Sequence, residues 1–69
     1  MGKEYRRELL SKSLSKLSLL PAREQEILRM RYGIGIPEKP LKEIAEHFGV
    51  SEPTIRRYEH MAIRKIEKL

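Results

Sequence analysis

Apolar residues recur along this chain at helical spacing, and no stretch shows the alternation typical of a strand. The apolar positions between residues 41 and 48 follow the i, i+3, i+4, i+7 spacing of an amphipathic helix. They are Leu41, Ile44, Ala45 and Phe48. A second stripe, again at steps of three and four, comprises Ile55, Tyr58, Ala62 and Ile66. The pattern predicts an all-α fold.

The residues between these two helices predict a tight turn. Gly49 directly follows the first helix, and glycine adopts at little cost the left-handed conformation that commonly ends a helix. Val50 can turn inward as an apolar plug. Ser51 is a good N-cap whose hydroxyl can accept from the amide of Thr54, and Pro53 suits the first turn of the next helix. Residues 41–67 are therefore predicted to form a helix-turn-helix, although a plain helical hairpin shares half of these features.

Two more helices are predicted before this motif, which makes residues 1–69 a single small four-helix domain. An amphipathic helix within residues 1–19, from about Lys3 to Leu17, carries a leucine stripe. The stripe consists of Leu10, Leu14 and Leu17. A second helix, within residues 21–33, begins at Pro21 and is ended by Gly33.

The side chains of the second helix divide into two groups. Ile27, Leu28 and Tyr32 can face inward, whereas Arg23, Arg29 and Arg31 are candidates for solvent or phosphate. The segment from residue 33 to 40 contains two glycines and two prolines, which is typical of a connecting loop. Its two isoleucines, Ile34 and Ile36, are expected to fold back onto the core.

Composition narrows the possible functions. The 69 residues give a modest core, a size that argues against an enzyme. The chain has no cysteine, and no apolar run approaches the roughly 18 residues of a membrane span. Lysine and arginine total 15 against 10 acidic residues, so the net charge of +5 favours a nucleic acid, although a merely soluble basic surface also fits. We expect a cytoplasmic protein with no cofactor and no small-molecule substrate.

The two histidines do not suggest a metal site, because no carboxylate spacing around His47 or His60 makes a ligand cluster. On the helix-turn-helix interpretation, several polar residues lie on or near the outer face of the second helix, where a recognition helix meets the major groove of DNA. They are Glu52, Pro53, Thr54, Arg56, Arg57 and His60. Of these, His60 is at the edge, where it could touch a phosphate.

Three blocks of this sequence resemble region 4 of the sigma-70 family of bacterial RNA polymerase sigma factors, over residues from about Leu17 to Leu69. The blocks are LPAREQEILRMRYGIG from Leu20 to Gly35, LKEIAEHFGVS from Leu41 to Ser51, and IRRYEHMAIRKI from Ile55 to Ile66. The first block discriminates most, because the helix end Arg31-Tyr32-Gly33 with a short loop before the motif is similar to that family specifically.

The resemblance implies binding to the minus-35 element of promoter DNA together with docking on the flap of the β subunit of core RNA polymerase. By the same resemblance, Arg56 would read bases or enter the groove. Ser51, Lys42 and Arg23 would lie near backbone phosphates, which position the protein without specifying the sequence.

The start of the recognition helix departs from the family pattern. Glu52, Pro53 and Thr54 stand where arginine, glutamate and arginine are usual, and Arg57 replaces a usual glutamine. A carboxylate at Glu52 could accept from a cytosine amino group, or it could serve only the dipole of the helix N-terminus. We therefore expect an alternative or divergent sigma factor, or a detached sigma-like domain, with its own sequence preference. Its base-reading set would be Arg56, Arg57, Glu52, Pro53 and Thr54.

The leucine stripe of the first helix allows two interpretations. Leu10, Leu14 and Leu17 either belong to the core of the domain or line an apolar cup for a helix of another protein. The resemblance favours a shared role, with the polymerase flap on apolar residues of the N-terminal half and with anti-sigma or activator proteins competing for that surface.

Two other functions remain open at this stage. A LuxR-type activator domain also has four helices and a similar recognition block, and it would dimerise on paired half-sites. A protein-interaction module that has lost DNA binding is the other alternative, since Glu52 and Pro53 are unusual for a DNA-facing surface.

Overall fold

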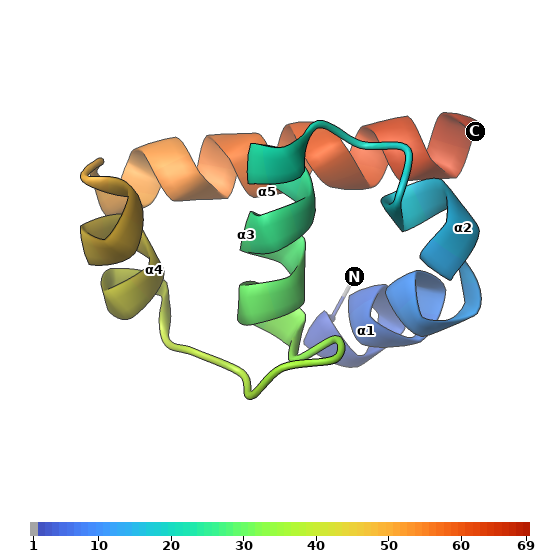
Figure 1. The fold of residues 1–69 in the computed structure, drawn as a ribbon, viewed down its shortest axis with the longest axis horizontal. Coiled ribbons are helices and arrows are strands. Elements are labelled where there is room, and N and C mark those ends of the chain that lie inside the picture. The colour runs from blue at the N-terminus through green and yellow to red at the C-terminus, as the bar shows by residue number, and fades with distance from the viewer. Residues whose placement is uncertain (1) are drawn as a thin grey trace.

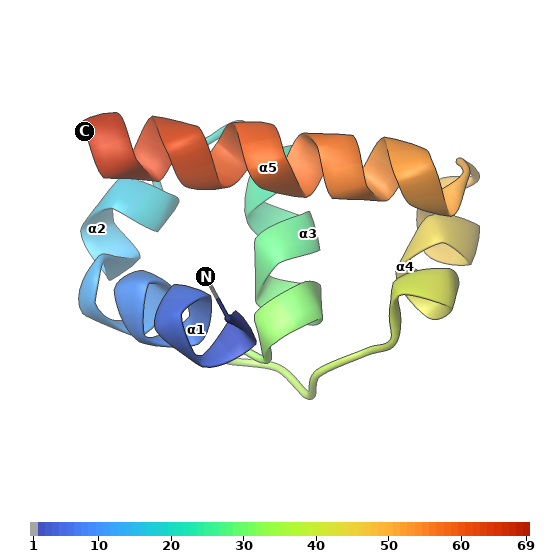
Figure 2. The same cartoon turned by 180° about the vertical axis from the view of Figure 1, so that it is seen from behind.

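The computed structural model describes residues 2–69, so residue 1 of the predicted domain lies outside the described part. Within this range the chain forms only helices, which confirms the all-α prediction. They are α1 (Lys3–Lys12), α2 (Leu14–Leu17), α3 (Ala22–Tyr32), α4 (Leu41–Phe48) and α5 (Glu52–Lys68). The long helix α5 runs along one side of the molecule, and α3 lies between α4 and the pair α1 and α2 (Figure 1). Figure 2 shows the same order from behind.

The single helix predicted from Lys3 to Leu17 is wrong, because the chain breaks at Ser13 into α1 and α2. Ser13 leaves the helical region, with φ −123° and ψ 40°. In a straight helix Leu10, Leu14 and Leu17 would share one face. The break instead buries Leu10 and Leu17 completely and leaves the Leu14 residue 49% exposed. Packing against the rest of the domain therefore decides the course of this segment.

The second predicted helix is confirmed as α3, although it begins one residue later, with Pro21 at the N-cap. Gly33 ends it in the left-handed region at φ 67°, and the amide of Ile34 bonds back to the carbonyl of Arg29 at 3.0 Å. Ile34 is buried as expected, but Ile36 is 39% exposed, so the prediction for Ile36 is wrong. Gly35, with φ 78°, turns the chain away from the core between the two isoleucines.

The core consists of two apolar clusters, and α3 and α5 contribute to both. The first cluster joins α1 and α2 to these helices and contains Leu10, Leu17, Leu20, Leu28, Tyr32, Ile34, Ala62, Ile63 and Ile66. The second cluster joins α4 to them and contains Ile27, Met30, Leu41, Ile44, Ala45 and Ile55. Phe48, Val50 and Tyr58 are only partly buried and pack against the second cluster. The helix-turn-helix is thereby fixed to the N-terminal half of the chain through α3 and α5.

Candidate nucleic-acid interface

The turn between α4 and α5 has the geometry expected of a helix-turn-helix. Gly49 adopts φ 68° and ψ 33°, the left-handed conformation predicted for it. The amide of Val50 donates to the carbonyl of Ala45 at 3.0 Å, which closes the end of α4. The Val50 side chain packs against the second cluster, as expected for an apolar plug. The turn therefore holds α4 and α5 together from the inside.

The start of α5 is stabilised by its N-cap residue. The Ser51 hydroxyl oxygen accepts from the amide of Thr54 at 3.3 Å, as predicted. The same oxygen lies 2.9 Å from the Thr54 hydroxyl oxygen, so the two side chains are hydrogen-bonded. Pro53 stands in the first turn, where no amide hydrogen is needed. The N-terminal end of the recognition helix is thus well ordered by local bonds.

The predicted base-reading residues gather at this end of α5. Pro53, Arg56 and Arg57 are exposed, whereas Glu52 and Thr54 are half-buried. Within residues 2–69, no carboxylate forms an ion pair with Arg56 or Arg57. Their positive charge is therefore directed to the solvent beside the turn, where it can attract a polyanion.

Besides Ser51 in the turn, the predicted phosphate-contacting residues come from three helices. Lys42 lies exposed on the first turn of α4, and His60 lies exposed on α5. Arg23, on the first turn of α3, is exposed and donates from Nη1 to the Tyr58 hydroxyl at 3.2 Å. Its guanidinium carbon is also 5.5 Å from the centroid of the Tyr58 ring. Arg23 is thereby joined to the recognition helix.

A buried carboxylate ties α5 to the rest of the domain. The side chain of Glu59 is only 8% exposed, and three partners donate hydrogen bonds to its two carboxylate oxygens. Arg6 of α1 donates to it at 2.7 Å, Arg31 of α3 at 3.1 Å and Tyr32 of α3 at 2.5 Å. A buried charge is tolerated only with such partners. Arg31 therefore serves the fold and does not face solvent or phosphate as a free cation, which corrects that expectation.

The pKa shifts of Tyr32 and Arg6 agree with these hydrogen bonds around Glu59. Burial raises the pKa of the Tyr32 phenol above its ordinary value, while the hydrogen bond from Arg6 opposes that shift. The hydrogen bond to Tyr32 is also the largest factor that raises the pKa of Arg6. Tyr32 consequently keeps its proton at neutral pH and donates it to the Glu59 carboxylate.

The three leucines predicted to meet a protein partner do not lie together on the surface. Leu10 and Leu17 have no exposed surface and belong to the first cluster, in agreement with the first of the two interpretations. Only Leu14 can be reached from outside. Leu19, in the turn that follows α2, is the most exposed large apolar residue at 73%. An apolar surface at this end of the molecule would therefore involve α2 and the turn after it.

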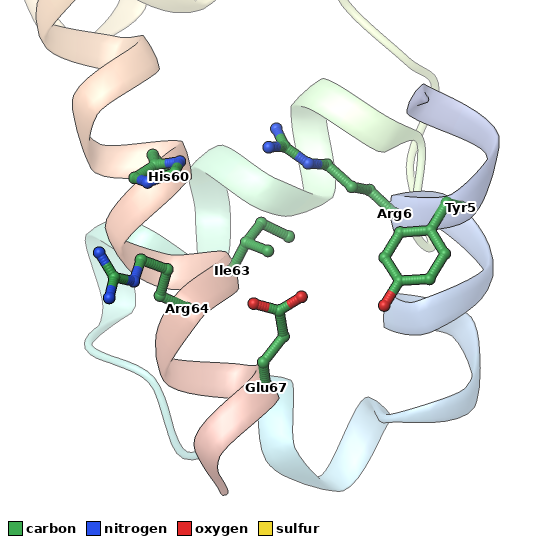
Figure 3. Close-up of a pocket in the computed structure, with 6 residues that line it drawn as sticks. All are labelled: Tyr5, Arg6, His60, Ile63, Arg64 and Glu67. Atoms are coloured by element: carbon green, nitrogen blue, oxygen red, sulfur yellow. The ribbon is translucent and has the colours of Figure 1, made fainter. Parts of the chain in front are cut away.

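A shallow hollow of about 210 Å³ lies between α1 and α5. Tyr5 and Arg6 contribute from α1, and the floor contains Ile63, which is buried (Figure 3). The remaining side chains come from one stretch of α5: His60, Arg64 and Glu67. In Figure 3 the Glu67 carboxylate points into the space between the two helices. The hollow is separate from the recognition turn.

In the part of the chain that the structure describes, no three potential ligands among His, Cys, Asp and Glu come together. The Nε2 atom of His47 lies 3.7 Å from a carboxylate oxygen of Glu26, and both side chains are about half exposed. No helix within residues 2–69 is long and apolar enough to cross a membrane.

The role of Glu59 was not anticipated from the sequence, although a signal was present. Ile55, Glu59, Ala62 and Ile66 occupy one face of α5 at steps of four, three and four, and all four are buried. The apolar pattern predicts Tyr58 in this stripe, but Tyr58 is only half-buried. An acidic residue in phase with three buried apolar ones indicates a buried ion pair, since burying an unpaired carboxylate would be costly.

Comparisons with known proteins agree on one family. The family model for sigma-70, region 4, matches residues 16–68. An RNA polymerase sigma-E factor from Clostridium acetobutylicum is 38% identical over 66 residues, which cover 94% of this chain and 27% of that protein. The RNA polymerase sigma factor SigA of Nostoc sp. is 40% identical over 67 residues, which cover 96% of this chain and 16% of that protein. The chain thus spans less than a third of the length of these relatives. No solved structure matches it significantly.

Proposed function

This chain belongs to the sigma-70 region 4 family, and from that membership we propose that it recognises the minus-35 region of promoters and docks on the β flap of core RNA polymerase. It is a sigma-factor DNA-binding module and not an enzyme. The family match also sets aside the LuxR-type alternative. Because transcription starts on the bacterial chromosome, the proposed site of action is the cytoplasm.

The observation that carries the DNA-binding half of the proposal is a group of cations around the turn that have no carboxylate partner. Elsewhere, Glu59 pairs with Arg6 and Arg31, Glu38 with Lys3 and Arg7, and Glu24 with Lys65, while some cations, such as Arg29 and Arg64, are also unpaired within residues 2–69. Around the turn, no ion pair within residues 2–69 involves the cations Arg23, Lys42, Arg56 and Arg57. Uncompensated cations are what a DNA backbone requires.

We assign two roles within this surface. Arg56 and Arg57 read base edges, because an arginine can form two hydrogen bonds to one guanine. Glu52 and Pro53 shape the same reading surface, and the hydroxyl of Thr54, which is already bonded to Ser51, completes it. The phosphate-contacting set is Ser51, Lys42, Arg23 and His60. Since the first positions of the recognition helix are unusual for the family, the preferred sequence differs from the consensus minus-35 element.

The protein-binding half of the proposal rests on a narrower set of residues than the sequence suggested. Leu14 and Leu19 are exposed, whereas Leu10 and Leu17 are not. A partner that docks on the N-terminal half would therefore meet α2 and the turn after it. We propose this end of the molecule for the polymerase flap, with anti-sigma or activator proteins as competitors.

Selection of bound duplexes from a random pool tests the DNA-binding proposal directly. We expect an enriched motif of one half-site. Binding of the selected duplex should weaken steeply with salt, because each neutralised phosphate adds about 0.9 to the slope of the logarithm of the binding constant against the logarithm of the salt concentration. A slope near zero with no enriched motif would contradict the proposal and favour an interaction module without DNA binding.

A further inference from the structure

We propose that Tyr58 is a positioning residue that holds the guanidinium of Arg23 in place for a DNA backbone phosphate. The inference rests on the proposed DNA-binding function and adds a residue to it. Tyr58 belongs to the recognition helix α5, and Arg23 belongs to the first turn of α3. The beginning of α3 lies against α5 in both views of the fold (Figures 1 and 2).

The contact between the two side chains is specific in two ways. Nη1 of Arg23 donates to the Tyr58 hydroxyl oxygen at 3.2 Å, and the guanidinium carbon lies 5.5 Å from the ring centroid. A cation over an aromatic face is attracted by the ring quadrupole. The Tyr58 ring is itself partly buried against the second cluster, so it provides a firm support. A long, exposed arginine side chain is thereby restricted to one region of the surface.

The chemical nature of the partner matters because the acceptor on Tyr58 is a phenol hydroxyl and not a carboxylate. Arg31, which is on the same helix as Arg23, forms an ion pair with the carboxylate of Glu59. Arg23 is oriented without being neutralised, since none of the ion pairs within residues 2–69 includes it. A cation that is both ordered and uncompensated binds an anion with less loss of side-chain entropy.

The dipole of α3 does not favour a cation at this position. The N-terminal end of a helix carries partial positive charge, so an arginine in the first turn of α3 is electrostatically unfavourable in the free protein. The same end attracts an anion. Arg23 is therefore better placed for an external phosphate than for the stability of its own helix.

The position of Tyr58 on α5 also links it to the DNA-facing end. Ser51, Thr54 and Tyr58 follow one another at steps of three and four, so they share a face that begins at the N-cap. The first two are hydrogen-bonded to each other through their hydroxyl groups. Tyr58 extends this row of hydroxyls to the guanidinium of Arg23. Arg23 is thereby connected through Tyr58 to the face of α5 that begins at the N-cap.

A double-mutant cycle tests the inference on the duplex selected for the wild type. Tyr58→Phe keeps the ring and its packing but removes the hydroxyl acceptor, so we expect affinity to fall about two- to tenfold from the loss of side-chain ordering. Arg23→Gln should reduce the log–log salt slope by about 0.9, which corresponds to one phosphate. In the Arg23→Gln background, Tyr58→Phe should have no further effect. Tyr5→Phe, on the exposed face of α1, is the matched control.

Two outcomes would overturn the inference while the proposed function stands: an unchanged affinity of Tyr58→Phe, or an equal loss from Tyr58→Phe in both backgrounds. Nitrogen relaxation of the Arg23 Nε–H group in the free proteins provides a second measurement, and the group should be more mobile in Tyr58→Phe than in the wild type. Equal mobility would also overturn it. If the wild type binds no duplex in a salt-dependent manner, the proposed function itself fails, and the inference fails with it.

Discussion

The hydroxyl of Tyr32 donates a 2.5 Å hydrogen bond to the carboxylate of Glu59 and so joins α3 to the recognition helix inside the domain. Arg31, also on α3, donates to the other carboxylate oxygen of Glu59. Arg6 of α1 donates to the same oxygen as Tyr32. Burying a carboxylate stabilises a fold only when its partners are in place. The carboxylate of Glu59 and its three donors therefore add to the apolar core in fixing α5 to the N-terminal half.

Replacing Glu59 with glutamine should strongly destabilise the domain. The substitution leaves two arginines without their carboxylate, and breaking a buried pair typically costs about 3 kcal/mol or more. The loss in free energy of unfolding should lie near the lower end of that cost, because the Arg6 and Arg31 side chains are each 27% exposed and keep some hydration. Urea unfolding measures the change. Glu67→Gln, on the exposed side of the same helix, is the control and should stay within about 0.5 kcal/mol. Equal stabilities of the two variants would refute this role of Glu59.

The two helix-ending glycines should differ in their tolerance of alanine. Gly33 and Gly49 have nearly the same backbone conformation, with φ 67° and 68°, so each substitution costs about 1 kcal/mol for the left-handed region alone. At Gly49 a Cβ atom would meet nothing within 4 Å, whereas at Gly33 it would lie 3.3 Å from Cβ and 3.4 Å from the amide nitrogen of Glu38. Thermal unfolding should therefore show Gly33→Ala to be the less stable variant. The reverse order would contradict this account of the loop.

Removing the N-cap of α5 should weaken the recognition helix. Ser51→Ala deletes the acceptor for the Thr54 amide and should lower the free energy of unfolding by about 1 kcal/mol. Chemical denaturation followed by circular dichroism gives the value. Ser15→Ala, at an exposed position of α2, is the matched control and should be nearly neutral. A comparable loss in both variants would mean that the cap contributes nothing specific.

Acid should destabilise the contact between α1 and the loop before α4. Glu38 bonds to Lys3 and Arg7 of α1, and the hydrogen bond from Lys3 is the main factor that lowers the pKa of Glu38 below its ordinary value of 4.5. The unfolded chain therefore binds more protons than the folded one as the pH falls below about 4.5, so stability declines there. Urea unfolding across pH 3 to 6, roughly the range around an ordinary glutamate pKa, measures this. In Glu38→Gln the free energy of unfolding should fall less steeply with decreasing pH. An unchanged dependence on pH would mean that Glu38 does not cause the decline.

Arg56 and Lys42 should affect DNA binding differently. Arg56→Ala is expected to cost about 1 to 3 kcal/mol on the preferred duplex and to relax the preference at one base pair. Lys42→Ala should weaken binding to all duplexes alike and lower the salt slope by about 1. Competition with single-base variants of the selected duplex distinguishes the two. If both variants lost affinity for all duplexes alike, the assignment of Arg56 to base reading and of Lys42 to phosphate contact would be wrong.

Local sequence rules were sufficient to predict the turn between α4 and α5. Gly49, Ser51 and Pro53 each have one preferred place relative to a helix end, and the structure has all three there. The exposure of Arg56 and Arg57 followed from helical phase in the same way. Their part in reading DNA stays a prediction.

Contacts between distant residues could not be predicted by the same rules. The bend at Ser13 brings Leu10 and Leu17 into one cluster, and spacing within the segment does not reveal it. The partners of Glu59 come from 28 and 53 positions away, so nothing near Glu59 in sequence identifies them. Arg31 was misassigned for this reason, since an arginine on a helix face has the same local pattern whether its partner is solvent or a buried carboxylate.

The 53-residue separation between Arg6 and Glu59 bears on the order of folding. Closing so long a loop costs more chain entropy than forming the contacts between α4 and α5, which are neighbours in sequence. We therefore expect the recognition turn to assemble early and α1 to dock on α5 afterwards. In the reverse direction, we expect α1 to detach before the helix-turn-helix unfolds.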